Sequence, residues 1–140
     1  MAGVVLLDTG PLVAVLDERE EHHAWAALRV AEIELPVWTC GAVLAEACFL
    51  LARHRPALAR LGFLVRNGGI RPVEEDERLW SRAFALMERY SNVPMSFADA
   101  CLVASAEQRE GARLFTLDGD FLIYRDGNGQ PLPLIAPFEK

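Results

Sequence analysis

Lysine is almost missing from this chain, since Lys140, the final residue, is the only one. Phosphoacceptor receivers and haloacid-dehalogenase-type phosphatases need a buried lysine beside their aspartates, and the last residue of the chain is poorly placed to serve there. The phosphate-binding patterns G-x-x-x-x-G-K-[ST] and G-x-G-x-x-G are also absent. The sequence therefore argues against proteins that handle phosphate groups through a lysine or a glycine-rich loop.

Long apolar runs and paired cysteines are missing too. The N-terminus has no basic segment, and the apolar run at residues 4–7 is too short for a signal peptide. No stretch approaches the roughly 18 uninterrupted apolar residues of a membrane span. Cys40, Cys48 and Cys101 are odd in number, lack C-x-x-C spacing and lie among apolar neighbours, which is typical of reduced core residues. We therefore expect a cytoplasmic protein without a membrane segment.

Positive charge is scarce, because 20 acidic side chains against 14 basic ones give a net charge of −6. Proteins that coat nucleic-acid duplexes are usually basic, so broad backbone binding is disfavoured, whereas a nuclease whose metal ions supply positive charge locally stays compatible. Residues 53–71 nevertheless hold five arginines and no acid. We expect this segment, with Arg53, Arg55, Arg60 and Arg66, to contact the phosphates of a nucleic acid or an acidic segment of a partner protein. An ordinary solvated helix is the alternative.

Strand and helix signals alternate along the 140 residues, of which 52% are hydrophobic and 24% charged, as expected for one globular domain. Short apolar runs predict strands at residues 4–7, 36–39, 70–73 and 113–116, with a proline-interrupted edge strand at 132–135. Helices are predicted at residues 12–16, 20–34, 41–53, 57–66 and 74–90, and from the N-cap Ser96 to Gly111. This alternation favours an α/β protein with a parallel sheet and helices on both faces.

Aspartates follow two of these strands. Asp8 comes directly after residues 4–7, and Asp118 and Asp120 follow residues 113–116. The carboxyl ends of parallel strands are where open α/β sheets keep their sites. Asp8 alone could be an N-cap or an Asx turn, and Asp118 with Gly119 could be only a turn. Because two strands end in the same acidic way, we expect a shared site.

Two nearly apolar helices each carry a carboxylate that needs an explanation. Asp99 lies three residues after Ser96, where it could merely complete a capping box. Glu46 is the only charge between residues 41 and 52, in a helix expected to be buried nearly all round. No base stands at positions 42, 43, 49 or 50 to pair with it, and a buried lone carboxylate is costly unless a cation binds it. The alternative is that Glu46 occupies a narrow exposed stripe.

Carboxylates gathered at one site repel one another, and without a cation at least one pKa would be raised. Ligands that are all oxygen suit Mg²⁺ or Mn²⁺ rather than zinc. Such an ion can activate water and stabilise a leaving oxygen at phosphorus. No serine, cysteine or histidine arrangement competes as a nucleophile, so metal-assisted phosphodiester hydrolysis is the chemistry these residues support best.

The order of these segments resembles the PIN-domain family, and within it the VapC-type toxins of type II toxin–antitoxin systems. The resemblance rests on V-V-L-L-D-T at residues 4–9, the helical Glu46, S-F-A-D-A at 96–100 and T-L-D-G-D-F at 116–121. It implies a three-layer α/β/α sandwich with a central, mostly parallel sheet. Residues 1–140 would form one PIN-like domain, with its core at about 3–122 and a C-terminal tail at 123–140.

The resemblance also implies a Mg²⁺-dependent endoribonuclease, with Mn²⁺ as a substitute, that forms a homodimer and is inhibited by a small antitoxin protein. By motif position, the catalytic and metal-binding quartet falls on Asp8, Glu46, Asp99 and Asp118. Asp120 is close enough to replace or assist Asp118, and Thr9 and Ser96 match supporting polar positions. A catalytically silent PIN-like binding module and a metal-dependent DNA nuclease are the alternatives. The choice of RNA rests on the resemblance alone, because no residue here is identifiable as a reader of the 2′-hydroxyl.

Overall fold

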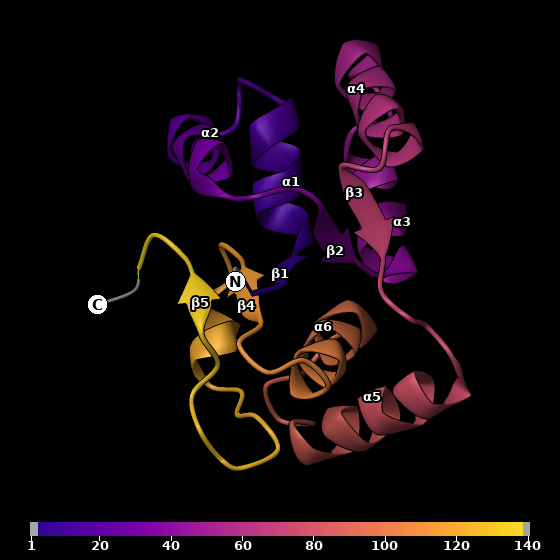
Figure 1. The fold of residues 1–140 in the computed structure, drawn as a ribbon, viewed down its shortest axis with the longest axis vertical. Coiled ribbons are helices and arrows are strands. Elements are labelled where there is room, and N and C mark those ends of the chain that lie inside the picture. Colours follow the sequence, from indigo (N-terminus) through magenta and orange to yellow (C-terminus); the bar gives the residue numbers. More distant parts are fainter. Residues whose placement is uncertain (1–2, 139–140) are drawn as a thin grey trace.

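A five-stranded sheet forms the centre of the protein, whose computed structural model describes residues 3–138 (Figure 1). The strands are β1 (Val5–Leu7), β2 (Val37–Thr39), β3 (Ile70–Pro72), β4 (Arg113–Phe115) and β5 (Leu134–Ile135). They lie in the order β3-β2-β1-β4-β5, and every pair is parallel. The spatial order reverses between β1 and β4, so a topological switch point lies there.

Six α-helices connect or flank the strands: α1 (Thr9–Leu16), α2 (His23–Glu32), α3 (Gly41–Leu50), α4 (Arg55–Arg66), α5 (Glu77–Arg89) and α6 (Phe97–Glu107). A short 3₁₀ helix, η1 (Gly119–Leu122), follows β4. Helix starts match their sequences: Pro56 lies in the first turn of α4, and Asp76 caps α5 by accepting the Leu79 N–H at 3.0 Å. No helix within residues 3–138 combines the length and apolarity needed to cross a bilayer.

The sheet separates two helical layers, as expected for an α/β/α sandwich. Figure 1 shows α1 and α2 on one side of it and α5 and α6 on the other, while α3 and α4 continue past β3 as an arm. The two faces of β1 follow this division, because Leu7 lines a cavity together with Leu12 of α1, whereas Leu6 lines another together with Ser105 of α6. All three residues of β1 are buried, which explains why its sequence is apolar without alternation.

The expectation that the helix after residue 40 is buried nearly all round is wrong. Within α3 only Val43 and Ala47 are buried, while Phe49 is 80% and Leu50 55% exposed. Cys48 is exposed as well, so it is not a core cysteine. The cause is position, because α3 packs mainly against α1 and α6 and leaves the rest of its surface exposed. Apolar composition alone does not separate a buried helix from one whose outer face is bare.

The C-terminal segment is more than a tail. Residues after 122 supply β5, which pairs with β4 through Leu114 and Leu134, and they supply the fully buried Tyr124. The predicted edge strand at 132–135 is therefore confirmed in its shorter form. A turn precedes β5, in which the Asp126 carboxylate accepts the backbone N–H groups of Asn128 and Gln130 at 2.8 Å each.

Candidate active site

An acidic cleft opens at the switch point between β1 and β4. Its volume is about 430 Å³, and it is bordered by the ends of both strands, the start of α6 and the middle of α3. Five carboxylates, two polar groups and smaller or apolar side chains line it: Asp8, Glu46, Asp99, Asp118, Asp120, Thr9, Ser96, Gly10, Leu50, Pro94 and Leu117. Every residue that the sequence predicts for the metal site, or as its support, thus borders one cavity.

Asp8 is held rigidly at the end of β1. Its backbone N–H donates to the Phe115 carbonyl at 3.0 Å, which continues the pairing with β4. Its two carboxylate oxygens accept from different groups: Oδ1 from the Thr9 backbone N–H at 2.8 Å and Oδ2 from the Thr116 hydroxyl at 2.7 Å. Asp8 is therefore both the N-cap of α1 and a cleft residue, so the two interpretations of this aspartate are compatible.

Asp99 enters the cleft from the first turn of α6. Ser96 caps this helix, since its hydroxyl accepts the Asp99 backbone N–H at 3.0 Å. The carboxylate does not complete a capping box among the described residues. Its Oδ2 instead accepts the hydroxyl of Tyr124 at 3.0 Å. The side chain of Asp99 is thus oriented by a tertiary contact and lines the cleft.

Asp118 and Asp120 occupy the turn after β4. The Asp118 backbone N–H donates to the Thr116 hydroxyl at 2.9 Å, and Asp118 Oδ1 accepts the Asp120 backbone N–H at the same distance. The Thr116 hydroxyl therefore connects this turn to Asp8, because it donates to one aspartate and accepts from the backbone of the other. Both acids of the turn are half-buried and line the cleft.

Glu46 reaches the cleft from α3, although it is exposed rather than buried. Its Oε1 accepts the hydroxyl of Thr9 at 2.9 Å, so Thr9 orients Glu46 with its side chain and Asp8 with its backbone. The expectation of a buried lone carboxylate was wrong, and its exposed-stripe alternative describes the burial correctly. The exposed stripe nevertheless faces the other acids.

Burial and mutual repulsion make the cleft unfavourable for negative charge. Asp8 and Asp99 are only 7% and 8% exposed. Burial, with smaller contributions from the charges of Asp118 and Glu46, raises the pKa of Asp8 to about 6 despite the lowering effect of the hydrogen bonds from Thr116 and Thr9. Burial and then the charge of Asp8 raise the pKa of Asp99 to about 7. Within residues 3–138, no basic side chain lines this cleft, so the counter-charge must come from elsewhere.

The donor set fits a hard divalent cation. Every candidate ligand is a carboxylate or hydroxyl oxygen, which suits Mg²⁺ or Mn²⁺. Within residues 3–138, no three of these carboxylates bring oxygens within 4.8 Å of one another. Mg²⁺ does not require that, since it commonly keeps several waters and is held by one or two carboxylates.

The PIN domain family model matches residues 5–126. This chain belongs to the PIN domain family. The family uses divalent metals for nuclease chemistry in general, and the predicted resemblance and fold are confirmed. A comparison with curated protein sequences found no match.

Solved structures with the same fold include several toxin–antitoxin proteins. VapC20 of Mycobacterium tuberculosis, described as a sarcin-ricin loop cleaving toxin, is 26% identical with a TM-score of 0.70, over 83% of this chain and 91% of that one. VapBC2 from Rickettsia felis, bound to a promoter DNA fragment, is 14% identical with a TM-score of 0.61, over 95% and 98% of the two chains. FitAB bound to the IR36 DNA fragment is 18% identical with a TM-score of 0.64, over 98% and 97%.

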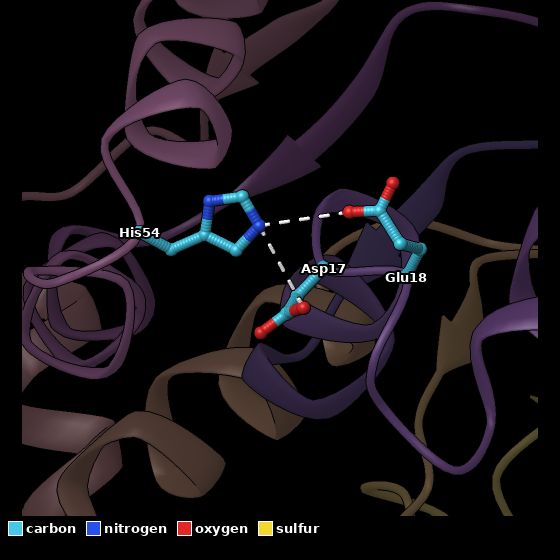
Figure 2. A group of neighbouring side chains, drawn as sticks. All are labelled: Asp17, Glu18 and His54. Atoms are coloured by element: carbon cyan, nitrogen blue, oxygen red, sulfur yellow. Dashed lines mark ion pairs between the residues drawn. The ribbon is translucent and has the colours of Figure 1, made fainter.

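This PIN domain has a second group of close titratable side chains outside the cleft, formed by Asp17, Glu18 and His54 (Figure 2). His54 Nε2 lies 3.7 Å from an oxygen of each acid, and the group connects the end of α1 to the start of α4. The Arg19 guanidinium already binds both oxygens of Asp17, at 2.9 and 3.0 Å, and these hydrogen bonds lower the pKa of Asp17 to about 2. His54 Nδ1 accepts the Ala57 N–H, so the ring proton of the neutral form lies on Nε2 and faces the acids. We interpret this group as a structural ion-pair cluster rather than a metal site.

The arginines predicted to contact RNA or an antitoxin lie on and before α4 of the PIN domain. Arg53, Arg55, Arg60 and Arg66 are all exposed. Arg60 donates to the Leu16 carbonyl, which ties the arm to α1. None of the four lines the acidic cleft.

Two residues that orient the acids of the PIN domain escaped the sequence interpretation: Thr116 and Tyr124. Thr116 directly precedes the acidic turn, and its polarity at the end of a buried strand was a usable signal. Tyr124 carried no such signal, because it lies in a stretch that was interpreted as a tail and 25 residues from Asp99.

Proposed function

We propose that this PIN domain is a Mg²⁺-dependent endoribonuclease and the toxin of a toxin–antitoxin pair. The observation that carries the proposal is the convergence of Asp8, Glu46, Asp99 and Asp118 on one cleft, where burial raises the pKa of two of them. Acids kept in such surroundings are costly for the fold, which is typical of a functional site. The family assignment supports phosphodiester hydrolysis as the chemistry.

Asp8, Glu46, Asp99 and Asp118 would hold the metal, with Asp120 available beside Asp118. Bound Mg²⁺ would supply Lewis acidity and positive charge for in-line hydrolysis at phosphorus. The chain's own hydrogen bonds orient the ligands: Thr116 and the Thr9 N–H hold the two oxygens of Asp8, and the Thr9 hydroxyl holds Glu46.

Tyr124 has a separate effect, because it donates to Asp99 and thereby favours the ionised form. Without this donor, Asp99 would hold its proton to a higher pH.

RNA is preferred over DNA as the substrate because VapC20, described as a sarcin-ricin loop cleaving toxin, is similar in structure at 26% identity. That similarity supports RNA as a class and leaves the individual RNA open. The test is cleavage of structured and unstructured RNAs, cellular RNA and a DNA control, with Mg²⁺ or with EDTA. We expect Mg²⁺-dependent RNA cleavage that Asp99→Asn abolishes while the variant stays folded.

Two outcomes would favour the alternatives. Binding of Mn²⁺ without cleavage of any RNA, including cellular RNA, would indicate a silent binding module. Cleavage of DNA alone would refute the ribonuclease assignment and leave the metal chemistry intact. Growth arrest on expression that Asp99→Asn relieves would support the toxin assignment.

As part of the toxin proposal, we also propose that the chain binds an antitoxin protein and forms a homodimer. An apolar cavity of about 80 Å³ between α1, α2, α4 and β3, lined by residues such as Val30, Leu35 and Leu64, is suited to one apolar side chain of the antitoxin. The bare face of α3, with Phe49 and Leu50, is suited to a homodimer contact beside the cleft that Leu50 lines. In sedimentation measurements, Phe49→Asp should shift the purified chain towards monomer. Dimers of unchanged stability would place the homodimer contact elsewhere.

A further inference from the structure

A second cavity lies on the α6 side of the sheet, towards the end of α6 remote from Asp99. Its volume is about 140 Å³, and it shares no lining residue with the acidic cleft. Val4, which directly precedes β1, Leu6 of β1 and the Trp38 side chain of β2 form an apolar floor. Its polar lining residues are Glu74, Ser105, Gln108 and Arg109. We call it the Trp38 cavity.

The buried hydroxyl of Ser105, which lines this cavity, has no hydrogen-bond partner among the described residues. Ser105 is 4% exposed, and its Oγ has no hydrogen-bond partner among residues 3–138. Buried hydroxyl groups are nearly always hydrogen-bonded, so an unpaired one that lines a cavity calls for a donor or acceptor in that cavity. A serine within a helix can donate its hydroxyl to a backbone carbonyl of the preceding turn. Ser105 lies within α6, but its hydroxyl forms no such hydrogen bond.

Two guanidinium groups lie close to the indole ring of Trp38. Arg71 and Arg109 place their Cζ atoms 5.6 and 5.5 Å from the centre of the indole ring, within the range of cation–π attraction. Neither arginine forms an ion pair with a carboxylate of residues 3–138. The chain has a net charge of −6, so two arginines without an ion-pair partner beside one aromatic ring make this region unusually positive. Guanidinium and indole planes are the surfaces on which nucleobases stack.

The volume of the Trp38 cavity and its polar lining residues restrict the chemical class of ligand that it can bind. The cavity is smaller than the roughly 300 Å³ at which ordinary small-molecule pockets begin, so it takes a fragment rather than a whole nucleotide. Its polar lining residues offer both hydrogen-bond donors and acceptors, because Arg109 can only donate, Glu74 accepts, and Ser105 can do either. A flat, apolar body with donors and acceptors along one edge matches that pattern, whereas a bare phosphate would be repelled by Glu74.

We propose that the Trp38 cavity binds a nucleobase, which belongs to a free nucleotide or to an unpaired position of RNA. The ring would occupy the apolar floor beside Trp38, with its polar edge towards Arg109, Glu74 and Ser105. The proposal does not depend on nuclease activity, because it concerns binding at a cavity separate from the acidic cleft.

The test uses the full chain labelled with ¹⁵N, in EDTA so that no divalent metal is present. The Trp38 indole N–H signal is assigned by its loss in Trp38→Phe. The ligands are the four ribonucleoside 5′-monophosphates, each up to about 10 mM, which exceeds the millimolar Kd expected of a fragment. Ribose 5-phosphate serves as the ligand without a base, and a single-stranded RNA forms a separate arm. We expect the Trp38 signal to move while those of Trp25 and Trp80 stay in place.

Two variants and two matched controls decide where the ligand binds. Arg109→Gln should weaken binding at least about fivefold, the lower end for loss of a bidentate base contact, and Ser105→Ala about threefold. Arg78→Gln and Ser81→Ala, at exposed positions of α5 outside the cavity, should leave the Kd unchanged.

Each result is decisive for the proposal. A Trp38 shift with mononucleotides identifies a free nucleotide as the source of the base, and a shift with RNA only identifies an unpaired RNA base. No shift with any nucleotide or RNA overturns the proposal. So does an equal shift with ribose 5-phosphate, or a Kd that Arg109→Gln and Ser105→Ala do not change.

Discussion

Replacing Asp99 by asparagine should stabilise the metal-free protein. The folded state holds the Asp99 proton with a pKa of about 7, against an ordinary value of 3.8. Between these two pH values the folded state binds more protons than the unfolded state, so stability falls as pH rises. Integration of this linkage gives a cost of about 4 kcal/mol at pH 8 and about 2 kcal/mol at pH 5.

Asparagine removes that cost and keeps an oxygen that can accept the Tyr124 hydroxyl. We therefore expect Asp99→Asn to raise the free energy of unfolding by roughly 2–4 kcal/mol at pH 8 and by about half as much at pH 5. The measurement is urea unfolding in EDTA at both pH values, since urea, unlike guanidinium chloride, does not screen the carboxylates. Adding Mg²⁺ should stabilise the wild-type protein and reduce the difference.

Asp76→Asn is the matched control, because Asp76 is an exposed N-cap that lies outside the cleft. Its unfolding free energy should change by less than about 0.5 kcal/mol at either pH. The reasoning fails if Asp99→Asn destabilises the protein by the ~1 kcal/mol of a lost capping interaction. It also fails if the gain is the same at pH 5 and pH 8.

Three further predictions concern cleavage and binding. Asp118→Asn should lower single-turnover RNA cleavage more than Asp120→Asn, and the reverse order would identify Asp120 as the working acid of the turn. Tyr124→Phe should move the acidic limb of the pH–rate profile to higher pH, because it removes the hydrogen bond that lowers the pKa of Asp99, and that pKa should then rise; an unmoved limb with normal folding would show that this bond is only structural. Arg53→Gln combined with Arg55→Gln should reduce the slope of log K against log salt for single-stranded RNA by about 1.4, and an unchanged slope would leave these arginines as ordinary solvated residues.

The order of secondary structure was decided locally, and the sequence was sufficient for it. Residues 5–7 are apolar on both faces because the strand is central, and Ser96 and Asp76 mark the starts of α6 and α5 through their own side chains. The position of Asp8 after β1 and of Asp118 after β4 followed from the same patterns. Parallel strands then bring their carboxyl ends to one edge, so a shared acidic cleft was predictable without coordinates.

Only the tertiary structure decided how those acids are held. Thr116 connects Asp8 to the Asp118 turn, and Tyr124 donates to Asp99 across 25 residues of sequence, which no local pattern specifies. The exposure of Glu46 could not be predicted either. A helix that is apolar on all sides has the same sequence pattern whether protein or solvent covers its outer face. Local periodicity reports which face of an element is apolar. Which element covers that face depends on contacts between distant segments, and these exist only once the chain has folded.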